Sequence, residues 1–399
     1  MNTANQGSAA HSRLSLTGNE AAALALKQAN PDVAAVFPIT PQTELMHSFS
    51  AYVADGLVKT EMVYVESEHS AMSAVVGAAA AGARSVTATS ANGLALMWEI
   101  VYIAASLRLP IVMPVINRAL SGPINIHCDH SDTMGCRDSG WIQLFCENSQ
   151  EAYDTVICAF RVAEHKDVLL PVMVNFDGFI ISHTTEVVDT ITDDALVAGF
   201  IGEYQPHVAL LDVDNPVTIG PLDLQDFYFE HKRQQLEGMA NAPAVIDGVF
   251  GEYEKITGRK YERIECYRTE DAEYIIMALG STAGTTKDAI DVLREKGHKV
   301  GHVKVRSFRP FPAELLENVL KGKKAVMVLD RSLSFGSPVG PLCMEVMQTL
   351  YGKSDVLVRN FVYGLGGRDI FVPQIVETVE SVIAHGKDLP LQSFIGLRE

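Results

Sequence analysis

Apolar residues recur along the first half of the chain with two different spacings, and the two spacings alternate. Short continuous apolar runs, such as residues 34–37, are typical of strands buried in a parallel sheet. Longer segments carry apolar residues three and four positions apart, as Leu45, Met46 and Phe49 do within residues 41–56, and this spacing is typical of helices. The alternation predicts an α/β fold in which helices cover both faces of a doubly wound parallel sheet.

Between about residue 18 and residue 185, strands and helices are predicted to follow one another. Pro38 lacks a backbone donor and should end the first strand, and Pro41 should lie in the first turn of the next helix. The predicted strands cover residues 34–40, 62–67, 85–90, 111–117 and 169–177. The predicted helices cover residues 19–30, 41–56, 68–82, 93–107, 139–148 and 151–164.

Residues 186 to about 270 interrupt this pattern, because prolines at positions 206, 216, 221 and 243 punctuate them. We interpret them as a linker region that wraps another surface, with an exposed helix at 223–240. A second α/β unit follows, with predicted strands at 272–281, 299–308, 323–330 and 355–364 and predicted helices at 285–297, 313–320, 341–351 and 372–384. We therefore predict one domain over residues 1–260, with its core at about 18–185, and a second domain over residues 261–399.

The chain is acidic: its 399 residues include 32 Lys and Arg against 49 Asp and Glu, a formal net charge of -17. Without a run of Lys and Arg, this charge argues against binding to nucleic acid or to an anionic membrane. Residues 1–20 are polar and lack the apolar core of a signal peptide, and Glu99, Arg108 and Pro110 interrupt the most apolar stretch. We expect a soluble, cytoplasmic protein.

The cysteines argue against a cluster or disulfides in this chain. Six are present and none belongs to a CxxC pair, a spacing that fits neither a disulfide framework nor an iron–sulfur or structural zinc site. His127, Cys128, Asp129, His130 and Asp132 crowd too closely for a regular zinc site, so we assign no metal to this chain. If the protein transfers electrons, its clusters lie on another chain.

Polar residues with possible chemical roles follow several predicted strands. Thr40 follows the first, Glu66 and Glu68 follow the second, and Arg118 directly follows a later one. Because the carboxyl ends of parallel strands form the ligand-binding edge of such a sheet, one carboxylate is expected in a dry crevice. Arg118 there is suited to a substrate carboxylate, which a guanidinium grips with two bonds, and Arg137 is the next candidate. Helix capping by Thr40 and the preference of acids for a helix start are the alternative explanations.

A further polar group lies at a predicted helix start. Thr89, Ser90, Asn92 and Gly93 form a cradle for a polar or anionic group, although ordinary capping explains them nearly as well. The chain has no GxxxxGK[ST] loop, no strand-linked GxGxxG, and no GDG segment that would hold a diphosphate through magnesium. The glycine-rich residues 363–369 are predicted to form a turn.

Four segments together resemble a known family. They read FPITPQTELM (37–46), ESEHSAMSAVVGAAAAGARSVTATSANGLALM (66–97), NRALSGPINIHCDHSDTMGCRDSGWIQLFCENSQEAYD (117–154) and YGLGGRD (363–369). In this order they are similar to the alpha chains of pyruvate:ferredoxin oxidoreductase, or pyruvate synthase, within the 2-oxoacid:ferredoxin oxidoreductase family. The resemblance runs from about residue 15 to 385. Each motif alone is weak, and the set is specific.

The resemblance implies a fold and a multisubunit enzyme. The chain would combine a pyrimidine-type thiamine-diphosphate-binding domain with a transketolase C-terminal-like α/β domain. A beta chain would carry the diphosphate and Mg²⁺ motif and a [4Fe-4S] cluster, and gamma and delta chains, separate or fused, would carry further [4Fe-4S] clusters. The implied reaction is reversible oxidative decarboxylation of pyruvate with coenzyme A to acetyl-CoA and CO2, with electrons passing to ferredoxin.

The resemblance also implies roles for individual residues. Glu68, immediately before the predicted helix and therefore preferred to Glu66, matches the glutamate that hydrogen-bonds N1′ of the aminopyrimidine. That bond favours the imino tautomer, which removes the proton from C2 of the thiazolium ring. Thr40 and Arg118 match the residues that hold the carbonyl and the carboxylate of the 2-oxo acid. The cradle residues Thr89 and Ser90 are predicted to contact the cofactor.

Three alternatives stay open at this point. The same family includes enzymes for 2-oxoglutarate, branched-chain and other 2-oxo acids, although the long DHSD loop with GWIQLFCEN favours pyruvate. A chain of a lipoamide-linked 2-oxo acid dehydrogenase also uses a glutamate, but FPITP and YGLGGRD speak against it. A non-catalytic assembly subunit is disfavoured because Thr40, Glu68 and Arg118 are all present.

Overall fold

The computed structural model describes residues 11–398, and residues 1–10 of the first predicted domain and of the predicted polar start lie outside them. The strands of the first unit are β1 (His11–Leu16), β2 (Val33–Val36), β3 (Glu61–Tyr64), β4 (Ser85–Val86), β5 (Val112–Asn117), β6 (Ile142–Phe145), β7 (Val172–Asp177) and β8 (Glu186–Ile191). Its helices are α1 (Gly18–Ala29), α2 (Thr43–Ala54), α3 (Glu68–Ala81), α4 (Ala91–Leu96), α5 (Trp98–Ser106), α6 (Ser131–Gly135), α7 (Ser149–Glu164), α8 (Asp194–Ile201) and α9 (Tyr228–Thr257).

The second unit completes the chain. Its strands are β9 (Ile264–Tyr267), β10 (Tyr274–Ala278), β11 (Val300–Val305), β12 (Ser307–Arg309), β13 (Ala325–Asp330), β14 (Leu357–Val362) and β15 (Gln392–Phe394). Its helices are α10 (Thr282–Glu295), α11 (Ala313–Leu320), α12 (Pro341–Leu350) and α13 (Val372–His385), with a short 3₁₀ turn at Leu365–Gly367.

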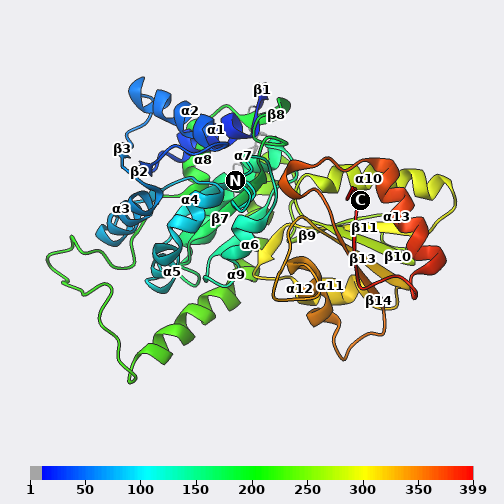
Figure 1. Cartoon of the computed structure of the whole chain (residues 1–399). Coiled ribbons are helices and arrows are strands. Elements are labelled where there is room, and N and C mark those ends of the chain that lie inside the picture. The colour runs from blue at the N-terminus through cyan, green and yellow to red at the C-terminus, as the bar shows by residue number, and fades with distance from the viewer. Residues whose placement is uncertain (1–10, 399) are drawn as a thin grey trace, which may run out of the picture.

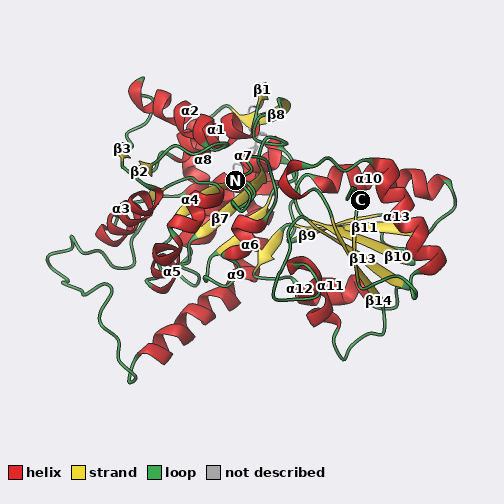
Figure 2. Ribbon diagram, viewed as in Figure 1, coloured by secondary structure: helices red, strands yellow, loops and turns green. Residues whose placement is uncertain are grey.

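Two mainly parallel sheets lie side by side, as Figures 1 and 2 show. One has seven strands in the order β12-β6-β7-β5-β4-β2-β3, and the other has six in the order β15-β14-β13-β10-β11-β9. Separate apolar clusters lie on the two faces of the first sheet: one includes residues of α1, α2 and α7, and the other includes residues of α3, α4 and α5. The predicted fold class, an α/β chain with two parallel-sheet units, is confirmed.

Local signals explain several of the helix ends. The α1 helix begins with a capping box between Thr17 and Glu20. The α3 helix begins after Ser67, whose hydroxyl accepts from the Ser70 amide at 3.2 Å, and ends at Gly82 with φ 104°. The α2 helix starts at Thr43, so Pro41 precedes the helix and does not lie in its first turn as predicted.

The prediction of a helix over 139–148 is wrong. Residues Ile142–Phe145 form β6, a fully buried strand beside β7. A short run that is buried on both faces shows no period, so its pattern does not distinguish a strand from a helix. The predicted helix at 93–107 is also divided, since α4 ends at Leu96 and α5 begins at Trp98, with Met97 between them.

The region after β8 differs from its predicted form as well. The exposed helix predicted at 223–240 is the first part of α9, which continues through Pro243 to Thr257. The preceding residues 203–227 run as a loop that projects from the body with the start of α9 (Figure 1). Within residues 11–398, none of the helices has the length and apolar character of a membrane span.

The two units are joined by a strand and by buried charges. The β12 strand pairs antiparallel with β6 and so extends the first sheet. Behind it, Lys304 Nζ and Arg306 Nη2 each donate to Glu151 Oε1 at 2.7 Å. Burial opposes ionisation of Glu151, but these two cations hold its pKa at about 2. The boundary between residues 260 and 261 stays a prediction.

Candidate functional site

Four predicted site positions lie at the same edge of the first sheet. The strands β5, β4, β2 and β3 are neighbours in that order, and all run parallel. Arg118, Ser90, Thr40 and Glu68 follow these four strands, respectively. The fold therefore gathers them at the carboxyl edge, where an open α/β sheet binds ligands.

Glu68 is a buried acid without a protein partner. It is the first residue of α3 and is only 7% exposed, whereas Glu66 is exposed. No hydrogen bond or ion pair involving the Glu68 carboxylate is present among residues 11–398. Buried carboxylates are normally paired, so an unpaired one at a sheet edge indicates a ligand-facing group.

The start of α4 lies against Glu68. A Cβ atom at position 93 would lie 2.8 Å from Glu68 Oε1 and 2.5 Å from Thr89 Oγ1, so only glycine fits there without a shift. The hydroxyls of Thr89 and Ser90 are buried and lack hydrogen-bond partners within the described part of the chain. The three polar side chains of Glu68, Thr89 and Ser90 thus have unused hydrogen-bonding capacity in one part of the structure.

We expect Gly93→Ala to lower the free energy of unfolding by about 1–3 kcal/mol, because the new methyl group displaces Glu68 and Thr89. Gly77→Ala is the matched control, since Gly77 lies inside α3 with no atom near its missing Cβ. That change should stabilise the chain by about 0.5–1 kcal/mol through helix propensity. Urea unfolding of both variants measures the difference, and equal stability of the two would contradict this packing.

Arg118 is a buried cation without an acidic partner. It is 8% exposed, and its Nη1 and Nε donate to the carbonyls of Thr40 at 2.9 Å and Asn125 at 3.0 Å. No ion pair of Arg118 occurs between residues 11 and 398. The structure thus brings Thr40 and Arg118 together through the Thr40 carbonyl, while Thr40 is exposed and its hydroxyl forms no hydrogen bond with the guanidinium.

Asp132 connects these two parts of the site. Its Oδ2 accepts from the amides of Ala91 and Arg118, each at 3.0 Å, and its Oδ1 accepts from Asn117 Nδ2 at 3.0 Å. Burial raises the pKa of Asp132 to about 6, and these hydrogen bonds oppose the rise. From the sequence, Asp132 is predicted only as one of the crowded residues that do not fit a zinc site, so this role at the sheet edge was missed.

The loop that carries Asp132 docks against the second unit. The predicted turn at 363–369 contains a 3₁₀ segment, and its Gly367 amide donates to the Cys128 carbonyl at 2.6 Å. Asn125 Nδ2 donates to the Gly366 carbonyl at 3.1 Å. The glycines 364, 366 and 367 all have positive φ, a conformation that side chains disfavour. The glycine-rich segment therefore braces the loop after β5.

His130 of this loop forms a hydrogen bond with a buried carboxylate. His130 Nε2 lies 2.7 Å from Asp177 Oδ1, and Arg331 Nη1 donates to Asp177 Oδ2 at 3.0 Å. Cys128, His130 and Asp177 lie close enough together to consider a cation. The guanidinium of Arg331 already neutralises that carboxylate, which makes a cation unfavourable.

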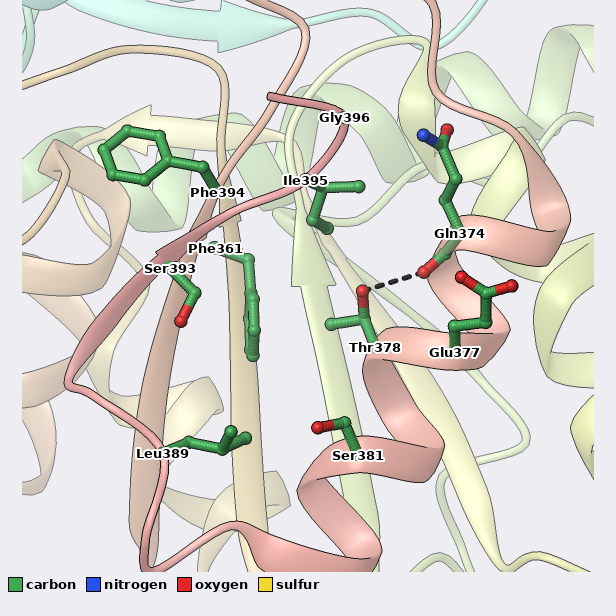
Figure 3. A pocket seen from close by; sticks show the side chains of 10 residues that line it. All are labelled: Phe361, Gln374, Glu377, Thr378, Ser381, Leu389, Ser393, Phe394, Ile395 and Gly396. Carbon is green, nitrogen blue, oxygen red and sulfur yellow. Dashed lines mark hydrogen bonds between the residues drawn. The ribbon is translucent and has the colours of Figure 1, made fainter. Parts of the chain in front are cut away.

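Two hollows lie elsewhere. One of about 340 Å³ lies between α13 and β14, where Phe361, Gln374 and Thr378 line it (Figure 3). There, Thr378 bonds the Gln374 carbonyl, and no buried charge lines the wall. The other hollow, of about 360 Å³, is lined by Arg137 and Lys232. Neither hollow contains Glu68 or Arg118.

The arrangement can perform two operations at one sheet edge. The unpaired Glu68 carboxylate can accept a hydrogen bond from, or exchange a proton with, a bound heterocycle. The unpaired Arg118 guanidinium can bind a small carboxylate. A site with these two functions suits a bound cofactor and a small anionic substrate.

Comparisons with known families cover most of the chain. The family described as "Pyruvate flavodoxin/ferredoxin oxidoreductase, thiamine diP-bdg" matches residues 24–251. The family described as "Pyruvate:ferredoxin oxidoreductase core domain II" matches residues 272–375.

Comparisons with individual proteins agree with this. The chain is 59% identical to pyruvate synthase subunit PorA of Thermotoga maritima, over 97% of this chain and 98% of that protein. It is 43% identical to ketoisovalerate oxidoreductase subunit VorA of Pyrococcus abyssi, over 93% of this chain and 94% of that protein.

A solved structure shares the fold. The chain resembles a 2-oxoglutarate:ferredoxin oxidoreductase from Magnetococcus marinus with a TM-score of 0.73 at 20% identity, over 93% of this chain. It spans only 65% of the length of that chain. A split-gene transketolase has a TM-score of 0.57 at 13% identity.

Proposed function

The chain belongs to the pyruvate:ferredoxin oxidoreductase family, as a thiamine-diphosphate-binding subunit of the pyruvate synthase PorA type, and from this premise we propose which of its residues act. Glu68, with Thr89 and Ser90, holds the aminopyrimidine half of the cofactor, and Arg118, with Thr40, holds the 2-oxo acid. The main support for this proposal is the burial of the Glu68 carboxylate at the carboxyl edge of the sheet, without a hydrogen-bond partner among the described residues.

The residues around Glu68 fit an aminopyrimidine. Such a ring presents nitrogen donors and acceptors along its edge, and the unpartnered hydroxyls of Thr89 and Ser90 offer matching groups. Gly93 leaves the Glu68 carboxylate free of a side chain that would cover it. When bound, thiamine diphosphate supplies a nucleophilic C2 carbon and an electron sink for decarboxylation. Glu68 has the role of holding a proton at N1′ of the pyrimidine.

Arg118 has the role of orienting the substrate. Its guanidinium is fixed by the carbonyls of Thr40 and Asn125, so it is held in place before a substrate arrives. A pyruvate carboxylate is a suitable counter-charge for a buried guanidinium. The hydroxyl of Thr40, whose carbonyl accepts from Arg118, is the group we assign to the carbonyl oxygen of the substrate. This arrangement would place the substrate at the strand end where the cofactor binds.

We assign the remaining chemistry to partner chains. The six cysteines of the chain include no CxxC pair, and none forms a disulfide within the described residues. We propose that a beta chain holds the diphosphate through Mg²⁺ and carries a [4Fe-4S] cluster. Gamma and delta chains, separate or fused, would carry further [4Fe-4S] clusters that pass electrons to ferredoxin. Coenzyme A would be the co-substrate that collects the acetyl group.

The projecting segment supports the assignment to a multisubunit enzyme. Leu211, Val213, Leu222 and Phe229 are 75%, 86%, 88% and 79% exposed. Residues 203–231 contain no Lys or Arg. A segment that exposes several large apolar side chains is typical of a surface that a partner chain covers.

The isolated chain should bind thiamine diphosphate weakly or not at all, because it has no diphosphate and Mg²⁺ motif. Isothermal calorimetry with Mg²⁺ present tests this, and the same titration on the complex with its beta chain is the control. Tight binding is expected only in the complex. Micromolar binding by the isolated chain would contradict a cofactor site shared between two chains.

Pyruvate is the better supported substrate. Identity to the PorA relative is 59%, against 43% for the VorA relative. A comparison of the steady-state rates on pyruvate and on 2-oxoisovalerate would decide, and a higher kcat/KM for the branched acid would reverse the assignment.

A further inference from the structure

Asp132 lies between the proposed cofactor contacts and the proposed substrate contact, and touches the backbone of both. It is 2% exposed and comes from the loop after β5. One of its oxygens, Oδ2, accepts from the amide of Ala91, which follows Ser90, and from the amide of Arg118, each at 3.0 Å. A single atom therefore fixes the start of α4 relative to the end of β5.

The other carboxylate oxygen of Asp132 also accepts two hydrogen bonds from N–H groups. Oδ1 accepts from Asn117 Nδ2 at 3.0 Å and from the Thr133 amide at 2.7 Å. Four N–H groups thus converge on one buried carboxylate, and no cation pairs with it in the described part of the chain. Hydrogen bonds of this kind to a charged acceptor are strong and directional.

The backbone at Ala91 shows that this position is constrained. Ala91 has φ 40°, in the left-handed region that a residue with a Cβ seldom adopts. Such a conformation persists where the surroundings determine it. The hydrogen bond from the Ala91 amide to Asp132 stabilises this backbone conformation. Because Ala91 directly follows Ser90, the same bond helps to position Ser90 and Gly93.

We propose that Asp132 is a positioning residue that couples the two halves of the site, setting the place of Thr89, Ser90 and Gly93 relative to Arg118. The inference rests on the proposed function. It adds that cofactor binding and substrate binding depend on the same carboxylate, although Asp132 touches neither ligand.

Asp132→Asn tests the coupling with little change of shape. An amide has one acceptor oxygen and one NH2 group, so in either orientation its NH2 group faces two N–H donors. In the assembled enzyme we expect the KM for pyruvate to rise, and the calorimetric affinity for thiamine diphosphate to fall, each by about tenfold, for donors left unpaired. Asp129→Asn is the matched control, because Asp129 accepts from Ser131 in the same loop and contacts neither Ala91 nor Arg118.

The outcomes separate this inference from the proposed function. A change in thermal stability alone, or a change in only one of the two quantities, would overturn the coupling, as would an equal pair of losses in Asp129→Asn. If Asp132→Asn does not assemble, Asn117→Ala removes one donor from the same carboxylate and should produce smaller losses in both quantities. If Asn117→Ala changes neither the KM for pyruvate nor the affinity for thiamine diphosphate, the inference is overturned. If Arg118→Ala leaves the KM unchanged, the proposed substrate role fails, whatever Asp132→Asn does.

Discussion

Glu68→Gln should reduce the turnover of the assembled enzyme by a factor on the order of 10² or more while leaving assembly intact. The amide has nearly the shape of the carboxylate, and no protein hydrogen bond to Glu68 is lost among residues 11–398. It cannot, however, take up and return a proton at the pyrimidine ring. The steady-state rate of pyruvate-dependent ferredoxin reduction is the measurement.

Glu66→Gln is the matched control for this prediction, because Glu66 is exposed two positions earlier in the chain. It should keep most of the activity. A loss of activity in Glu66→Gln with normal turnover in Glu68→Gln would exchange the roles of the two acids.

Arg118→Ala should raise the KM for pyruvate by roughly 30-fold or more, since truncating one partner of a buried charge pair costs about 2–5 kcal/mol. The affinity for thiamine diphosphate should remain close to normal, because the guanidinium has no proposed contact with the cofactor. Arg118→Lys should recover only part of the loss, since an ammonium group cannot form the planar two-bond grip.

The same variant distinguishes a structural role of Arg118. If the guanidinium only bridged the carbonyls of Thr40 and Asn125, its removal would lower stability and leave the KM unchanged. Arg137→Ala is the control, because Arg137 lines a different hollow and should not affect the KM. An increased KM in Arg137→Ala alone would move the substrate anchor to that residue.

Much of the site could be predicted from the sequence because it depends on strand ends. A buried apolar run followed by Arg118 places that arginine at the carboxyl edge wherever the strand pairs. Glu68 could be placed because an alanine-rich helix follows it directly. Local pattern and the geometry of parallel sheets place Arg118 and an acid at this edge, and the choice of Glu68 over Glu66 depends on the family resemblance.

The remaining features depend on contacts between distant segments. The role of Asp132 arises from an amide 41 positions away in the chain, which no local pattern encodes. The glycines at 366 and 367 contact Asn125 and Cys128 of the other unit, so their purpose is invisible within their own segment. Pro243 lies within α9 against the usual rule, because burial of Ala242 and Ile246 on one face of the helix outweighs the local cost.

We propose that Glu68 acts on a proton of the bound cofactor. Hydrogen–deuterium exchange at C2 of thiamine diphosphate in the assembled enzyme, followed by NMR, tests it most directly. We expect slow exchange in Glu68→Gln and near-normal exchange in Glu66→Gln and Arg118→Ala, since neither Glu66 nor Arg118 has a proposed contact with the pyrimidine. An unchanged exchange rate in Glu68→Gln, with cofactor bound, would contradict it.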